Sequence, residues 1–434
     1  MSNITTLANG NVWTDNKWEK TNIIIEDGDI VSLSPVKQEG IVFDMTGMHI
    51  FPGGIDPHVH FREPGATHKE DIFTGAYAAS HGGVTCAFDM PNTKPATVDL
   101  KTLKEKQKLA KDAPIRVKFF FGASSDNLHT IEGLKNLPAD EQPIGVKVYY
   151  GSTTGDLLFD KISYVKKLFQ VYEGVCVFHA ESEECIQNNM KKFKEDDISV
   201  HGKIRDPECA SKAVEEIIDA IPDGYKGRVH IAHVSTKTEV DLIRKAKADG
   251  KPITCEVTPH HLFLTEDDLE TLGNLGKVNP PLRPISDVNA LWDAIRDGTI
   301  DCLATDHAPH LLEEKYQSYK KAPAGIPGLE TAFPLMLGAV KDGNLTYEKL
   351  HELRFSLARE IYNIPEVLPI QVEASGDLTV VDLNKEWLIQ DEDMLSKSKW
   401  SPFTGTKVPA TVMMTMINGM IVYRNDNFEL KMII

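Results

Sequence analysis

The stretch "DPHVHFREPG" at residues 56–65 places two histidines, His58 and His60, one residue apart, and Arg62 follows two positions later. In an extended strand alternate side chains point to the same face, so both imidazoles would face one side. Imidazole nitrogens are common zinc ligands. The stretch therefore predicts a pair of metal ligands, although a single H-x-H pair is equally compatible with ordinary packing.

Further histidines, a lysine and an aspartate follow short apolar runs elsewhere, among them "GVKVYY", "GVCVFHAE", "RVHIAHVS" and "IDCLATDHAPH". If these runs are parallel strands of one barrel, their C-terminal ends share the rim at which such barrels place their chemistry. Several imidazoles and carboxylates at one rim can hold more than one metal ion. The side chains expected to meet there are His58, His60, Lys147, His179, His233 and Asp306.

The elements that must position these residues alternate regularly between strand and helix. Eight β-rich runs are separated by segments with helical spacing, such as "EDIFTGAYAASHGG" and "KTEVDLIRKAKADG". Eight such alternations predict a closed (β/α)₈ barrel of the TIM type over residues 52–365. A doubly wound open sheet is the alternative, but it usually has a glycine-rich phosphate turn after its first strand, and none is present here.

The two ends of the chain have a different pattern. Residues 1–51 and 366–434 contain alternating strands with hairpin-like turns, for example "NIIIEDGDIVSLS" and "ATVMMTMINGMIVY". We expect the two ends to pair into one small β-sandwich domain beside the barrel.

The composition narrows the class of function. The 47 basic and 64 acidic residues give a net charge of −17, which argues against a surface for nucleic acid or an anionic membrane. The N-terminus "MSNITTLANG" lacks a signal-peptide pattern, and no apolar run approaches the ~20 residues of a membrane span. The six cysteines form no C-x-x-C pair, and those in "VTCAF" and "GVCVFHA" are expected to be buried reduced thiols. These features predict a soluble cytoplasmic protein.

Several longer motifs resemble those of the dihydroorotases of the amidohydrolase superfamily. They are "DPHVHFREPG", "DMPNT", "GVKVYYG", "AHVSTK", "EVTPHHLFLTEDD", "KVNPPLRP", "ATDHAPH" and "GIPGLET", from about residue 52 to 335. The first motif together with "ATDHAPH" is highly specific, whereas D-x-H-x-H alone marks only the superfamily. The resemblance implies the reversible zinc-dependent cyclisation of N-carbamoyl-L-aspartate to L-dihydroorotate in de novo pyrimidine biosynthesis.

The resemblance also implies roles for the candidate ligands. His58, His60 and Asp306 would hold one zinc ion and His179 and His233 a second. Lys147, carboxylated by CO₂, would bridge the two ions together with a hydroxide. A buried lysine loses its proton readily, as carboxylation requires. Many bacterial relatives have an aspartate as the bridge, and in Lys147 this chain instead resembles the carboxylated-lysine members.

Asp306 would have a second role as the catalytic residue, unless it is a ligand alone. It would accept the proton of the attacking hydroxide and deliver it to the ring nitrogen that leaves.

We expect polar groups at the same rim to bind the substrate and determine its identity. Arg62 follows the two histidines with strand spacing, so it should share their face and bind a carboxylate with two parallel hydrogen bonds. By resemblance, further contacts to the substrate come from Asn92 and His310 (carboxylate), Asn279 (ring amide) and the backbone of Ala324 and Gly325.

Two further stretches each have an alternative interpretation. Thr153 and Thr154 lie in a loop that could close over the substrate, or that could be an ordinary βα loop. The neighbouring His260 and His261 would point to opposite sides of a strand, and neither is included in the ligand set.

Two alternatives stay open. Another cyclic-amide hydrolase (a hydantoinase, dihydropyrimidinase or allantoinase) would use the same metals but would not need Arg62. A non-catalytic scaffold of the same fold would lack ligands, and none is missing here. The resemblance further implies a homodimer, and some relatives associate with aspartate transcarbamoylase.

Overall fold

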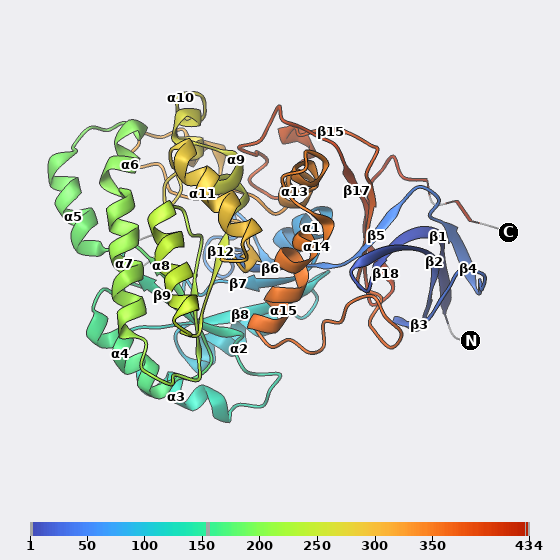
Figure 1. The fold of residues 1–434 in the computed structure, drawn as a ribbon, viewed down its shortest axis with the longest axis horizontal. Coiled ribbons are helices and arrows are strands. Elements are labelled where there is room, and N and C mark those ends of the chain that lie inside the picture. The colour runs from blue at the N-terminus through green and yellow to red at the C-terminus, as the bar shows by residue number, and fades with distance from the viewer. Residues whose placement is uncertain (1–2, 153–156, 430, 433–434) are drawn as a thin grey trace.

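A computed structural model describes residues 3–152, 157–429 and 431–432 of the chain. Eight parallel strands, β6 to β13, pair in the order in which they occur along the chain and alternate with helices (Figure 1). A bridge between Val59 and His307 joins the end of the first strand to the segment after the last one. The predicted (β/α)₈ barrel is therefore confirmed.

The barrel strands are short and buried. They are β6 (Gly54–Val59), β7 (Val84–Asp89), β8 (Arg116–Gly122), β9 (Gly145–Tyr150), β10 (Val175–Ala180), β11 (Arg228–Ile231), β12 (Ile253–Val257) and β13 (Cys302–Leu303). The longer helices around them are α1 (Ile72–His81), α2 (Leu100–Leu109), α4 (Ile162–Val171), α5 (Glu183–Lys192), α7 (Pro207–Ala220), α8 (Lys237–Ala248), α11 (Ile285–Arg296) and α13 (Ala332–Lys341). Shorter helices are α3 (Leu128–Gly133), α6 (His201–Ile204), α9 (Pro259–Phe263), α10 (Leu269–Leu272), α12 (Leu312–Lys315), α14 (Tyr347–His351) and α15 (Leu357–Ile361).

Strand β9 shows how the sequence divides the barrel into an outer and an inner layer. Val146, Val148 and Tyr150 pack into the apolar layer between the strands and the surrounding helices. Lys147 and Tyr149, at the alternate positions, line a pocket inside the barrel rim. Because side chains alternate along a strand, the apolar outer face fixes the polar residues toward the interior.

Local signals set where the outer helices begin. Helix α8 begins after Thr236, which forms a capping box with Glu239. Helix α7 begins after Asp206, whose side chain accepts from the amide of Cys209, and Pro207 occupies its first turn. The α8 cap ends the loop that follows β11, whereas α7 follows β10 only after α5 and α6.

Both ends of the chain contribute to one separate β-rich unit, as predicted (Figure 1). The N-terminal strand β5 pairs antiparallel with the C-terminal strand β14, with Ile50 opposite Val380. The strands of this sheet are β1 (Ile4–Thr14), β2 (Lys17–Glu26), β3 (Asp29–Ser34), β4 (Ile41–Asp44), β5 (His49–Pro52), β14 (Leu378–Asp382), β17 (Thr411–Ile417) and β18 (Met420–Arg424). A small ribbon, β15 (Trp387–Leu388) with β16 (Lys407–Val408), lies apart from it. The exact boundaries at 51/52 and 365/366 stay a prediction.

The cysteines are only partly as expected. Cys86 and Cys176, the two in the quoted apolar runs, are free and buried, as are Cys255 and Cys302. Cys185 on α5 and Cys209 on α7 form a disulfide, which sequence reasoning did not predict. Within the described ranges, no helix is long and apolar enough to cross a membrane.

Candidate metal centre and active site

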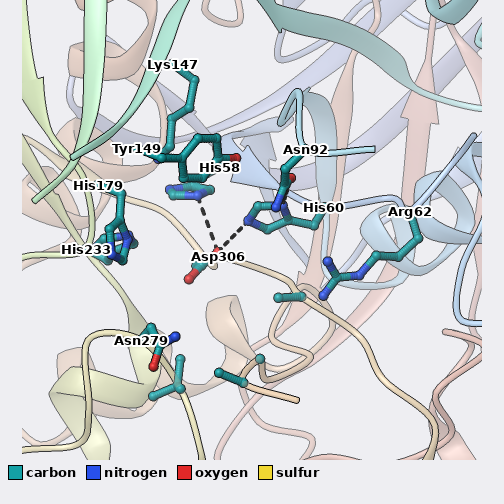
Figure 2. A pocket seen from close by; sticks show the side chains of 14 residues that line it. His58, His60, Arg62, Asn92, Lys147, Tyr149, His179, His233, Asn279 and Asp306 are labelled. Atoms are coloured by element: carbon teal, nitrogen blue, oxygen red, sulfur yellow. Dashed lines mark hydrogen bonds and ion pairs between the residues drawn. The ribbon is translucent and has the colours of Figure 1, made fainter. Parts of the chain in front are cut away.

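The C-terminal ends of the barrel strands meet around one pocket (Figure 2). The six predicted metal ligands all line it: His58, His60, Lys147, His179, His233 and Asp306. Five of the predicted substrate residues line it as well: Arg62, Asn92, Asn279, Ala324 and Gly325. The sixth, His310, is not among the lining residues, but its Nε2 contacts the guanidinium of Arg62.

Two imidazoles and a carboxylate form the first half of the cluster. Nε2 of His60 lies 3.0 Å, and Nε2 of His58 lies 3.3 Å, from Oδ1 of Asp306. One donor atom each of His58, His233 and Asp306 all lie within 4.8 Å of one another. Donor atoms this close can surround a divalent ion, since zinc binds nitrogen and oxygen at about 2.0–2.2 Å.

The second half is a pair of imidazoles. Nδ1 of His179, at the end of β10, lies 3.0 Å from Nε2 of His233, which follows β11 by two residues. His233 and Asp306 both adopt positive φ, 37° and 46°. Non-glycine residues rarely adopt this left-handed conformation, and it is often found at functional sites. In both cases the unusual backbone turns the side chain into the pocket after its strand has ended.

Glu256, on strand β12, forms a hydrogen bond with Nδ1 of His58. Its carboxylate accepts hydrogen bonds from Nδ1 of His58 at 2.5 Å, from Nε2 of His230 at 3.1 Å and from the amide of His233 at 3.3 Å. A carboxylate on one imidazole nitrogen fixes the tautomer and leaves the other nitrogen as a metal ligand. Sequence reasoning missed Glu256, although an acid inside the apolar strand "ITCEV" is a detectable signal.

Two other histidines also have a polar side chain beside one ring nitrogen. Nδ1 of His60 donates to Oδ1 of Asn92 at 2.8 Å. Nε2 of His179 lies 3.0 Å from Oε2 of Glu181, which also pairs with Arg205. Asn92, expected to bind the substrate, therefore also orients a metal ligand, and Glu181 is a second orienting carboxylate that sequence reasoning missed.

Lys147 is fully buried, and its Nζ has no hydrogen-bond partner among the described residues. Burial lowers its pKa to about 8, against the opposing effect of Glu256 and Asp306. An unpaired buried ammonium is costly, whereas the neutral amine is the form that combines with CO₂. The position therefore fits a carbamate that binds metal.

The charge states of the other ligands also fit a divalent ion. Burial lowers the pKa of His179 and of His233, so both imidazoles are neutral and can bind metal. Burial raises the pKa of Asp306, but His58 and His60 outweigh it and hold the pKa well below its usual range. Neutral nitrogen donors with an anionic oxygen form a ligand set that suits zinc.

Arg62 reaches the pocket from a turn, which corrects the strand-face argument. Strand β6 ends at Val59, and Arg62 has a φ of 61°. Its Nε donates to the carbonyl of Pro309 at 3.2 Å, and its Nη2 lies 3.0 Å from Nε2 of His310. These contacts, and not strand spacing, aim the guanidinium at the pocket.

Lys315 fixes the opposite wall. Its Nζ donates to the carbonyls of Lys277, Pro323 and Gly325 at 2.9–3.1 Å and so joins the segments that carry Asn279 and Gly325. Oδ1 of Asn279 is buried without a partner among the described residues, so it is available to a ligand.

The two stretches with alternative interpretations, His260–His261 and Thr153–Thr154, have different outcomes. His260 and His261 lie in helix α9, so the argument from strand alternation was wrong, although neither lines the pocket. Thr153 and Thr154 lie outside the described residues.

Tyr149 lines the pocket and was missed, although it follows Lys147 by two positions on the same strand. Burial raises the pKa of its phenol, so the hydroxyl is a donor.

Comparisons with known proteins show the family to which the chain belongs. The family model described as "Amidohydrolase family" matches residues 49–422. A dihydroorotase of Methanosarcina acetivorans is 33% identical over 440 residues, which cover 98% of this chain and 93% of that protein. A dihydroorotase of Staphylococcus aureus is 34% identical over 442 residues, covering 97% of this chain and 99% of that protein. The multifunctional protein CAD of Squalus acanthias is 40% identical over 375 residues, which are 86% of this chain but 15% of that longer protein.

Solved structures share the fold. An L-hydantoinase (dihydropyrimidinase) from Arthrobacter aurescens superposes with a TM-score of 0.91 at 26% identity, covering 99% of this chain and 98% of that one. A dihydropyrimidinase from Brevibacillus agri, at 23% identity and a TM-score of 0.89 over 98% of this chain and 96% of that one, shows the fold alone. The chain therefore belongs to the amidohydrolase family, and its full-length relatives include dihydroorotases.

Proposed function

We propose that this chain is a dihydroorotase, which catalyses the reversible zinc-dependent cyclisation of N-carbamoyl-L-aspartate to L-dihydroorotate. The observation that carries the proposal is a buried guanidinium, that of Arg62, in the same pocket as the six metal-ligand candidates. Both forms of the substrate bear one carboxylate that takes no part in ring opening or closure. The full-length relatives named dihydroorotases support this choice of substrate.

The ligand set supports two zinc ions. His58, His60 and Asp306 would hold one, His179 and His233 the other, and the carbamate of Lys147 would join them. Zinc bound there would supply an activated water at neutral pH and polarise the amide carbonyl.

The chain's own residues would bind the substrate and move the proton. Arg62 would bind the carboxylate through two parallel hydrogen bonds, with Asn92 and His310 beside it. Oδ1 of Asn279 would accept from the ring N–H, and the backbone of Ala324 and Gly325 would close the far side. The Asp306 carboxylate would take a proton from the attacking water and pass it to the ring nitrogen that leaves. In the cyclising direction it would return that proton as water departs.

A second candidate is a hydantoinase-type hydrolase, which the likeness to the Arthrobacter aurescens L-hydantoinase favours. It would act on rings without a carboxylate, so Arg62 would have no anion to bind. Rates of hydrolysis of dihydroorotate, hydantoin, dihydrouracil and allantoin separate the two. We expect dihydroorotate to have the highest kcat/KM, and faster turnover of hydantoin or allantoin would contradict the proposal.

Arg62 provides the matched test within the chain. Because a hydrogen bond to a charged group contributes about 1.5–3 kcal/mol, Arg62→Met should raise KM for dihydroorotate about 10- to 100-fold. Arg62→Lys keeps the charge but cannot form two parallel hydrogen bonds, so its KM should lie between those of the wild type and Arg62→Met. Zinc content, measured by metal analysis, should not change in either variant. An unchanged KM in Arg62→Met would remove the basis of the substrate assignment.

The cellular context stays a prediction. We expect a cytoplasmic homodimer, and association with aspartate transcarbamoylase is a further hypothesis. Light scattering of the pure chain, and co-purification with that enzyme, would test the two associations.

A further inference from the structure

Tyr149 is placed in the pocket by the same alternation that places Lys147. Its two neighbours on β9, Val148 and Tyr150, belong to the apolar outer layer, so the Tyr149 ring must face inward. The Nζ of Lys147 lies 5.4 Å from the centre of that ring. A phenol therefore stands beside the proposed bridging lysine, and nothing in the proposed mechanism uses it.

The hydroxyl of Tyr149 is buried and has no hydrogen-bond partner among the described residues. Leaving a buried hydroxyl unpaired costs about 1–3 kcal/mol, so such a group calls for an explanation. Tyr150 shows the usual arrangement, because its hydroxyl donates to Glu216 at 2.5 Å. Tyr362 also lacks a partner, but its ring packs against Phe88 and Phe120 and lines no pocket near the metal ligands.

The hydroxyl faces the end of the pocket where the substrate's carboxylate is expected. In Figure 2 it points to the side on which Asn92, His60 and Arg62 lie, and away from His179 and His233. Arg62 and Asp306 are both within electrostatic reach of the phenol. A neutral donor on the Arg62 side of the pocket can add a hydrogen bond to an anion that the guanidinium already attracts.

We propose that the Tyr149 hydroxyl donates a hydrogen bond to the carboxylate of the bound substrate and so acts, with Arg62, as a specificity-determining residue. This inference rests on the proposed function, because it requires a substrate that carries a carboxylate. The expected effect is selective. Removal of the hydroxyl weakens the binding of ligands that carry the carboxylate and leaves the binding of ligands without it unchanged. The donor acts in the ground state and the transition state alike, so its removal raises KM and not kcat.

The test compares Tyr149→Phe with Tyr150→Phe in the zinc-loaded full chain. Each variant loses one hydroxyl from adjacent positions of the same strand, but only Tyr149 faces the pocket. For Tyr149→Phe we expect KM for dihydroorotate about tenfold higher and kcat within about threefold of the wild type. Competitive inhibition by orotate should weaken by a similar factor, and inhibition by uracil, which lacks the carboxylate, should stay the same. Tyr150→Phe should keep all wild-type values.

The outcomes separate this inference from the proposed function. A wild-type chain that does not hydrolyse dihydroorotate would overturn both. If the wild type is active, an unchanged KM in Tyr149→Phe overturns the inference alone. So does a fall in kcat at constant KM, equal weakening of orotate and uracil, or loss of zinc, because each places the hydroxyl's action elsewhere than on the carboxylate.

Discussion

Replacing Glu256 with glutamine tests whether the metal centre depends on a residue that touches no substrate. The carboxylate of Glu256 is fully buried and accepts from Nδ1 of His58 at 2.5 Å and from Nε2 of His230 at 3.1 Å. Glutamine has nearly the same shape, but it is neutral and has only one acceptor oxygen. The substitution therefore removes the charge that fixes the tautomer of His58 without opening a cavity.

The magnitude follows from the loss of a charge-assisted hydrogen bond. Such a bond contributes about 1.5–3 kcal/mol, and loss of an outer partner of a metal-binding histidine typically lowers metal affinity 10- to 100-fold. We therefore expect zinc affinity to fall by about 1.4–2.7 kcal/mol. Competition with a chelator of known affinity measures the zinc affinity directly. The value of kcat in excess zinc shows how much activity is lost when His58 is no longer held in its orientation.

Glu239→Gln is the matched control. Glu239 is equally buried, but its carboxylate accepts from Ser235 and Thr236 and caps helix α8 away from the pocket. We expect a lower Tm and unchanged zinc affinity in this variant. If Glu256→Gln keeps wild-type affinity, or if Glu239→Gln loses as much, the orientation argument is wrong.

Three further predictions concern the walls of the site and the stability of the barrel. Gly325 has a φ of 146°, and a Cβ there would lie 2.5 Å from the carbonyl oxygen of Ala308, so Gly325→Ala should raise KM at least tenfold at constant zinc content. An unchanged KM would contradict the placement of that wall. Thiol titration of the unfolded chain should count four thiols before reduction and six after it, and reduction of Cys185–Cys209 should cost about 3 kcal/mol of stability; six thiols at the start would disprove the disulfide. Burial lowers the pKa of His201 from 6.5 to about 3, so the unfolded chain takes up the proton first and the free energy of unfolding falls as the pH drops below 6.5. Between pH 7.5 and 5.0 the wild type should therefore lose about 2 kcal/mol more than His201→Gln in denaturant titrations, and equal losses would refute the assignment.

The barrel was predictable because its strands show patterns of apolar residues in the sequence. In "GVKVYY" the apolar residues fill alternate positions, and that pattern fixes both the strand and the face that Lys147 occupies. The same rule placed His58 and His179, whose strands run up to the rim. Residues on strands can be assigned to a face from sequence, since the period of two leaves little choice.

The residues beyond the strand ends were harder to place for a physical reason. Arg62 lies in a turn with positive φ, and His260 and His261 lie in helix α9, so strand alternation says nothing about any of them. The motif resemblance predicted Arg62 at the substrate pocket, which it lines, but only the contacts with Pro309 and His310 explain its direction. Cys185 and Cys209 meet because α5 and α7 pack together, which spacing along the chain does not reveal.

The buried lysines show what only the three-dimensional structure could add. Among the described residues Lys106, Lys147 and Lys315 are fully buried. Lys106 pairs with Asp89 at 2.7 Å, and Lys315 donates to three carbonyls, so the fold supplies acceptors for both charges. The fold gives Lys147 imidazole neighbours and no such acceptor within the described chain. An ammonium in that position would be buried without a hydrogen-bond acceptor among the described residues, at a cost that the two other lysines avoid. Burial therefore lowers the pKa of Lys147 to about 8, which favours the neutral amine, and a neutral amine held among metal-binding histidines is the group that CO₂ can convert into a ligand.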